Sequence, residues 1–194
     1  ALDLDAYRRQ VRDLAGELER ALPGGADNEA KLQALRAFLF TENGFHGSRT
    51  DYSNRANSYI NRVLDDREGL PRTLSVLFLE LGRAIGIEGL AGAPLPGHFM
   101  VRYAPREGPI QLIDVFDGGK MLSRSDAQER VVEATGEGFR EEHLAAASKR
   151  DIIVRMLHNL QSFAERGGDF TDALHYSDLL VAVKNTTDRL TVTD

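Results

Sequence analysis

The feature that most limits the possible folds of this chain is a stretch of helical length that is apolar on nearly every side. Residues 71–85 read PRTLSVLFLELGRAI, and Gly86 follows them. A proline suits the first turn of a helix, and a glycine suits the position just after its end. Since a helix without a polar face must be surrounded by other elements, these residues predict a central, buried helix.

Three amphipathic helices are predicted on the N-terminal side of this central helix. Apolar residues at three- and four-residue steps begin at Leu4 and stop at the turn 23–25, which defines the first helix. The second helix is capped by Asp27 and runs to about Thr41, and the third covers residues 57–68. Each of these helices offers one apolar face to the core.

Two short runs after the central helix have the composition of β-strands. Residues 99–103 and 110–113 are separated by a connection of hairpin length that contains Pro105, Gly108 and Pro109. They predict an antiparallel pair.

Beyond Gly138 the pattern is helical again and predicts one pair of helices. A single pair is too short for a free-standing repeat array, so we expect it to pack on the rest of the chain. The fold class is therefore α+β. The expected parts are an N-terminal amphipathic helix at residues 1–25, a core at 26–136 and a helical tail at 137–194.

Composition and motifs exclude several function classes. The 194-residue chain has no cysteine, which rules out disulfides, thiolate metal sites and a cysteine nucleophile. A net charge of −6 does not favour binding to nucleic acid or to a membrane, and without a secretion signal we expect a cytoplasmic location. Phosphate-binding, zinc-binding and G-x-S-x-G motifs are absent, so we expect no cofactor and no metal. A cation at Asp114 and Asp117 would have too few ligands.

One arrangement of polar residues remains that has the order of a catalytic site. The central helix begins after Gly69, His98 opens a strand, and Asp114 ends the next strand. Helix, histidine and aspartate follow in this order in papain-like acyl-transfer enzymes, where the histidine is the base and the carboxylate orients it. Each residue alone has a simpler explanation, because histidines and aspartates are common at strand ends.

The sequence around these positions resembles the transglutaminase-like superfamily, and within it the bacterial SirB-type branch, which joins a transglutaminase-like core to a tetratricopeptide-like helical tail. The resemblance covers about residues 32–183 and rests on the stretches 43–47 (NGFHG), 57–64 (NSYINRVL), 69–75 (GLPRTLS), 96–99 (PGHF), 112–119 (LIDVFDGG) and 155–160 (RMLHNL). It implies a papain/transglutaminase-like core and matches His98 and Asp114 to the family's catalytic histidine and aspartate.

The same resemblance places Pro71 at the position of the catalytic cysteine, so the nucleophile is missing. Ser75 lies one helical turn further along, roughly 5 to 6 Å away, and a serine inside a buried helix usually bonds back to a carbonyl. Asn57, Asn61 and His46 also match the branch and, together with Pro71, are candidate binding residues. Helix capping, loop anchoring and simple exposure are their alternative explanations.

Two functions stay open at this point. The first is a catalytically inactive module whose cleft and helical tail bind a protein or peptide, which Pro71 and the lack of cysteine favour. The second is a cysteine-independent hydrolase or acyltransferase that uses Ser75, His98 and Asp114. The distance between the Ser75 hydroxyl and the His98 ring discriminates between them. The oligomeric state is left open by the sequence.

Overall fold

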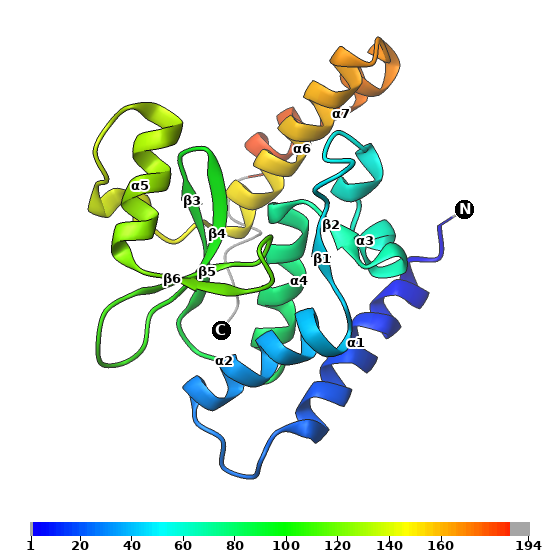
Figure 1. Cartoon of the computed structure of the whole chain (residues 1–194). Coiled ribbons are helices and arrows are strands. Elements are labelled where there is room, and N and C mark those ends of the chain that lie inside the picture. The colour runs from blue at the N-terminus through cyan, green and yellow to red at the C-terminus, as the bar shows by residue number, and fades with distance from the viewer. Residues whose placement is uncertain (1, 187–194) are drawn as a thin grey trace.

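A buried helix, α4 (Pro71–Ala84), stands at the centre of the computed structural model, which describes residues 2–186. Pro71 occupies its first turn, where the missing N–H group leaves no hydrogen bond unmade. Leu74, Phe78 and Leu81 are completely buried. The helix runs between the β-sheet and the N-terminal helices (Figure 1), so the predicted central helix is confirmed.

The N-terminal helices α1 (Leu4–Ala21) and α2 (Asn28–Arg36) cover one side of α4. Asp3 and Asp27 cap them by accepting hydrogen bonds from backbone N–H groups. α2 continues into a π-helical segment, η1 (Ala37–Glu42). The ring of Phe40 in this segment stacks on Phe78 of α4, with the ring centres 6.0 Å apart. The second helix therefore extends about as far as predicted, but its last part is π-helical instead of α-helical.

The segment before α4 differs from the single helix predicted at residues 57–68. It consists of a 3-10 turn, η2 (Arg55–Ser58), and a short helix, α3 (Ile60–Asp66). Tyr59 between them is extended (ψ 122°), and Arg67 adopts a left-handed conformation (φ 59°) that ends α3. This turn allows β1 (His46–Gly47) and β2 (Glu68–Gly69) to pair as parallel strands, which the sequence did not predict.

Four antiparallel strands form the main sheet, in the order β3-β4-β5-β6. They are β3 (Leu90–Leu95), β4 (His98–Tyr103), β5 (Gln111–Asp114) and β6 (Lys120–Leu122). The predicted hairpin corresponds to β4 and β5, whose register pairs Val101 with Ile113. Together with the surrounding helices, this sheet confirms the α+β class.

Helices follow the sheet to the end of the described chain. α5 (Arg124–Thr135) and a 3-10 turn, η3 (Glu141–Leu144), lead to the hairpin of α6 (Lys149–Arg166) and α7 (Phe170–Asn185). Figure 1 shows this hairpin extending away from the sheet. The last residues of the predicted tail, 187–194, lie outside the described residues. The predicted part boundaries at residues 25 and 136 stay predictions.

The hairpin is fastened to the core by a polar cluster at its turn. Arg55 of η2 forms ion pairs with Asp169, at 3.2 Å, and with Asp172. The hydroxyl groups of Tyr59 and Tyr176 lie 2.6 Å apart. These contacts join two segments that are more than 110 residues apart in the sequence.

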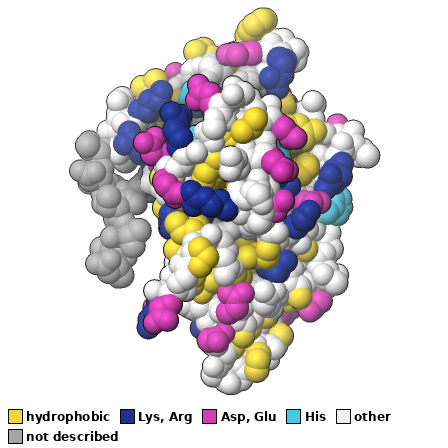
Figure 2. Space-filling view, turned by 60° about the vertical axis from the view of Figure 1, so that its left-hand side comes forward, with side chains coloured by type: hydrophobic (Ala, Val, Ile, Leu, Met, Phe, Trp, Pro, Cys, Tyr) yellow, Lys and Arg dark blue, Asp and Glu magenta, His cyan; other side chains and the backbone are white. Residues whose placement is uncertain are grey.

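The surface carries charges of both signs. On the face shown in Figure 2, Lys and Arg side chains alternate with Asp and Glu side chains, and apolar patches separate them. Among the described helices, none is both long and apolar enough to span a bilayer.

Candidate functional site

His98 and Asp114 meet because β4 and β5 are antiparallel neighbours. His98 is the first residue of β4 and Asp114 is the last residue of β5, so both lie at the same end of this strand pair. His98 Nε2 lies 3.6 Å from Asp114 Oδ2. This distance indicates an electrostatic contact that is longer than a normal hydrogen bond.

Asp114 is a buried carboxylate with several hydrogen bonds. Its side chain is 2% exposed, and Oδ1 accepts hydrogen bonds of 3.1 Å from the backbone N–H groups of Phe116 and Asp117. Burial alone would raise the pKa of Asp114, but the neighbouring His98 and Arg130 outweigh it and lower the pKa to about 2. The carboxylate is therefore ionised at neutral pH.

Arg130 of α5 is the third member of this group and the residue that sequence reasoning missed. Its Nη1 lies 3.1 Å from His98 Nε2 and 2.5 Å from Asp114 Oδ2. A guanidinium group only donates hydrogen bonds, so Nε2 must act as the acceptor. In this arrangement the Nε2 lone pair of His98 is directed at Arg130.

The three side chains open into a pocket of about 490 Å³. Its wall includes a second ion pair, between Arg49 and Asp117 at 2.6 Å, and the exposed Glu133 of α5. The other lining residues are Pro96, Gly97, Phe116 and Ala134. Gly97 has φ +73°, and a Cβ atom there would lie 2.5 Å from the Cβ of Ala134. Only glycine lets α5 approach the start of β4 so closely.

Pro71 and Ser75 do not reach this pocket. Neither residue is among the described residues that line the pocket. Ser75 is completely buried, and its hydroxyl donates a hydrogen bond of 2.7 Å to the carbonyl of Pro71. This is the structural role expected for a serine one turn inside a helix.

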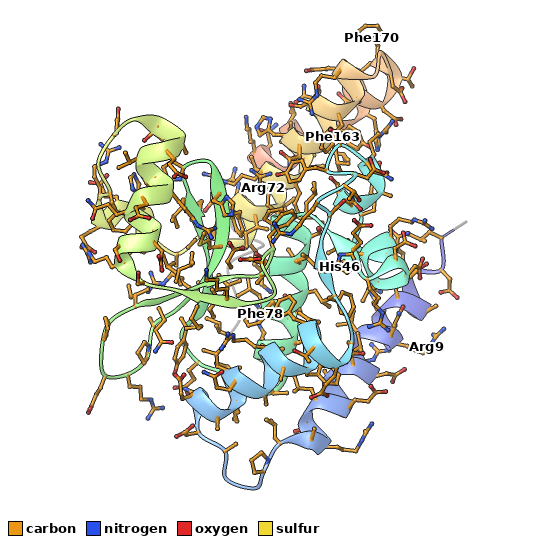
Figure 3. The ribbon with its side chains drawn as sticks, viewed as in Figure 1. Arg9, His46, Arg72, Phe78, Phe163 and Phe170 are labelled. Carbon is orange, nitrogen blue, oxygen red and sulfur yellow. The ribbon has the colours of Figure 1, made fainter. Side chains whose placement is uncertain are left out.

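The candidate binding residues Asn57, Asn61 and His46 lie at three different places. Asn57 is buried, and its amide donates a hydrogen bond of 2.8 Å to the carbonyl of Asp51, which anchors the preceding loop. Asn61 lines an apolar groove between α1, α3 and α6. His46 is exposed on β1 (Figure 3), where it lines a shallow depression next to the His98 pocket. Neither depression, nor the rest of the described chain, brings three His, Asp or Glu side chains together as for a metal ion.

A central helix followed by a histidine strand and an aspartate strand defines the papain-like, transglutaminase-like class of α+β proteins. The chain belongs to the transglutaminase-like superfamily, because the model of that family matches residues 5–158.

The chain is also similar to several curated proteins. A UPF0162 protein of Xylella fastidiosa is 36% identical over 137 residues, which cover 68% of this chain and 48% of that protein. A UPF0162 protein of Vibrio cholerae is 32% identical over 173 residues, 88% of this chain and 63% of that protein. F-box only protein 21 of Homo sapiens is 28% identical over 144 residues, 71% of this chain and 22% of that protein.

The chain thus spans less than two thirds of each of these relatives. No solved structure matches it.

Proposed function

We propose that this chain is a catalytically inactive transglutaminase-like module that binds a peptide or protein segment in the pocket around His98. The observation that carries the proposal is the position of Arg130, whose guanidinium contacts both His98 Nε2 and Asp114 Oδ2. A general base needs a free lone pair directed at the nucleophile. In this pocket the lone pair of Nε2 is directed at a cation instead.

The missing nucleophile supports the same conclusion. No cysteine is present in the sequence, and Pro71 has no group that attacks a carbonyl. The Ser75 hydroxyl is engaged with the Pro71 carbonyl inside the helix. The alternative hydrolase or acyltransferase would require Ser75 to leave this bond and reach the imidazole, which disfavours it.

Peptide binding is supported by the size and chemistry of the pocket. A volume of about 490 Å³ lies within the range of small-molecule and side-chain sites. Its wall contains positively and negatively charged side chains that can form hydrogen bonds, and the ring of Phe116. We assign the chain to the bacterial SirB-type branch and α6 with α7 to its tetratricopeptide-like tail, in a cytoplasmic protein without nucleic-acid or membrane partners.

Catalytic inactivity is tested with activated esters and with amine incorporation into a glutamine-containing protein. We expect wild type and His98→Ala to give the same turnover as a buffer blank. A turnover above the blank that His98→Ala or Ser75→Ala removes would contradict the proposal and favour the alternative.

Binding is tested by probing an immobilised peptide library with the purified chain. Peptides that bind saturably should lose affinity for Glu133→Trp, since a bulky ring at Glu133 narrows the pocket. Glu129→Trp is the matched control, because Glu129 is exposed on the same helix but is not one of the described lining residues. Absence of saturable binding, or equal binding by both variants, would refute a role for this pocket.

A further inference from the structure

The apolar groove between α1, α3 and α6 is a second cavity, with a volume of about 650 Å³. Figure 1 shows the N-terminal end of α1 next to α3, and residues of α6 complete the wall of the groove. Among the described residues, none lines both this groove and the His98 pocket. The two cavities can therefore bind different ligands.

Most side chains that line the groove are apolar, and those at its rim are open to solvent. Leu4 of α1 is 59% exposed and Ile153 of α6 is 37% exposed, whereas Leu160 is buried. A continuous apolar surface that stays open to solvent is typical of an interaction site.

Two walls of the groove are helix faces of equal length. The apolar residues that form them are Leu4, Tyr7 and Val11 on α1 and Ile153, Met156 and Leu160 on α6. Both sets follow the three- and four-residue steps of a single helix face, and each spans about two turns, roughly 10 Å. Such a groove fits a further helix, which would pack its own apolar face against both walls.

The charged residues that line the groove are basic. Among the described lining residues, only Arg8 and Arg12 carry a charge, and their four-residue spacing places them on the same side of α1. The Arg12 side chain has no partner among residues 2–186. Arg8 pairs with Asp5 at 3.3 Å, but this pair is weak because both side chains are at least 70% exposed. The nearby carboxylate of Asp65 already accepts a hydrogen bond of 2.8 Å from the Tyr7 hydroxyl.

We propose that this groove binds an amphipathic helix of a partner protein that carries acidic residues along one edge of its apolar face. The apolar face covers the two helix walls, and carboxylates one turn apart pair with Arg8 and Arg12. A helix fits better than a fatty acid, because small-molecule sites enclose most of their ligand and this groove leaves Leu4 and Ile153 exposed.

The groove is tested by fluorescence polarisation with two labelled synthetic peptides of about 14 residues. Both peptides have the same leucine face and alanine elsewhere, but one carries glutamate and the other lysine along the edges of that face. We expect the full chain to bind the glutamate peptide saturably. The lysine peptide should bind at least about ten-fold more weakly, because Arg8 and Arg12 repel it.

A charge placed on the apolar wall locates the binding site. Ile153→Glu should weaken binding of the glutamate peptide at least about ten-fold, because the new carboxylate would be buried against an apolar surface. Val132→Glu is the matched control. Val132 on α5 is 43% exposed and is not among the described lining residues of the groove, so this variant should bind as wild type does.

Charge reversal at the rim tests the predicted acidic character of the ligand. Arg12→Glu should weaken binding of the glutamate peptide and strengthen binding of the lysine peptide, each about five-fold. Arg20→Glu makes the same change in net charge at an exposed position of α1 that is not among the described lining residues. It should leave both affinities unchanged.

Several results would overturn the proposal. They are no saturable binding of the glutamate peptide, equal binding of the two peptides, and equal effects of Ile153→Glu and Val132→Glu. A dimer in analytical ultracentrifugation that Ile153→Glu dissociates, or binding of sodium laurate without binding of either peptide, would assign the groove to a different occupant. The proposed function fails separately, because Glu133→Trp narrows only the His98 pocket and should leave the affinity for the glutamate peptide unchanged.

Discussion

The hydroxyl of Ser75 donates a 2.7 Å hydrogen bond to the carbonyl of Pro71, so the serine considered as a replacement nucleophile is held inside the helix. Ser75→Ala removes this bond and leaves a better helix former. We expect the free energy of unfolding to change by no more than about 1 kcal/mol, as measured by urea denaturation. Ester turnover should be unchanged, and a loss of turnover would show that Ser75 has a chemical role.

Arg130 should stabilise the site through the charge of Asp114. Arg130→Met leaves this buried carboxylate with His98 as its remaining side-chain partner, and we expect a loss of about 2 kcal/mol in urea denaturation. This loss is smaller than the roughly 3–5 kcal/mol of a fully buried ion pair, because Arg130 is 27% exposed. Arg130→Lys keeps the charge and should recover part of the loss. If both variants matched wild type, the contact would be unimportant for the fold.

Acid should weaken the fold through Asp114. Its pKa in the folded state is about 2, against an ordinary value of 3.8, so the unfolded chain binds this proton more tightly. The resulting stabilisation is fully present above about pH 4, is lost as the pH falls toward 2, and amounts to about 2 kcal/mol. Denaturation midpoints between pH 5 and 2 measure it. Asp114→Asn should flatten this part of the profile, and a profile equal to wild type would contradict the assignment.

Gly97 should be more sensitive to substitution than a glycine with the same backbone conformation but open surroundings. Gly97→Ala adds a Cβ atom 2.5 Å from the Cβ of Ala134, in addition to the strain of a positive φ. Gly118→Ala is the matched control, because Gly118 has φ +63° but no atom within 4 Å of the added Cβ. We expect a loss of about 1 kcal/mol for Gly118→Ala and at least about twice that for Gly97→Ala. Equal losses of stability in the two variants would mean that α5 shifts to make room for the added methyl group.

Arg72 should lower the stability of the fold. Arg72→Met replaces a half-buried cation, whose Nε has no partner among residues 2–186, by an apolar side chain of similar length. We expect the free energy of unfolding to rise by about 1 kcal/mol in urea denaturation. Arg106→Met, at an exposed position, should stay within about 0.5 kcal/mol of wild type. A clear loss for Arg72→Met would indicate that the Arg72 side chain contributes favourable packing.

The central helix and the hairpin were predictable because their signals are local. An apolar stretch of helical length bounded by Pro71 and Gly86 predicts a buried helix. Two strand-like runs joined by a short connection around Pro105 predict a hairpin. The meeting of His98 and Asp114 follows from that hairpin, since antiparallel strands bring the start of one to the end of the next.

The features that escaped prediction depend on contacts between distant segments. β3 contains Gly92, Ala93 and Pro94, which have low strand propensity, and it forms because β4 supplies its hydrogen bonds. The parallel pair β1 and β2 joins residues 22 positions apart. Arg130 lies on an ordinary exposed-looking helix, and only the close packing of Gly97 against Ala134 brings its side chain to the site.

The turn η2 contacts both the C-terminal hairpin and the central helix. Arg55, its first residue, forms ion pairs with Asp169 and Asp172 at the α6–α7 turn. The carbonyl of Asn57 accepts hydrogen bonds from the Leu70 N–H group and the Thr73 hydroxyl at the beginning of α4. A force that displaces the α6–α7 hairpin would therefore also act on the first turn of α4, because both are attached to η2.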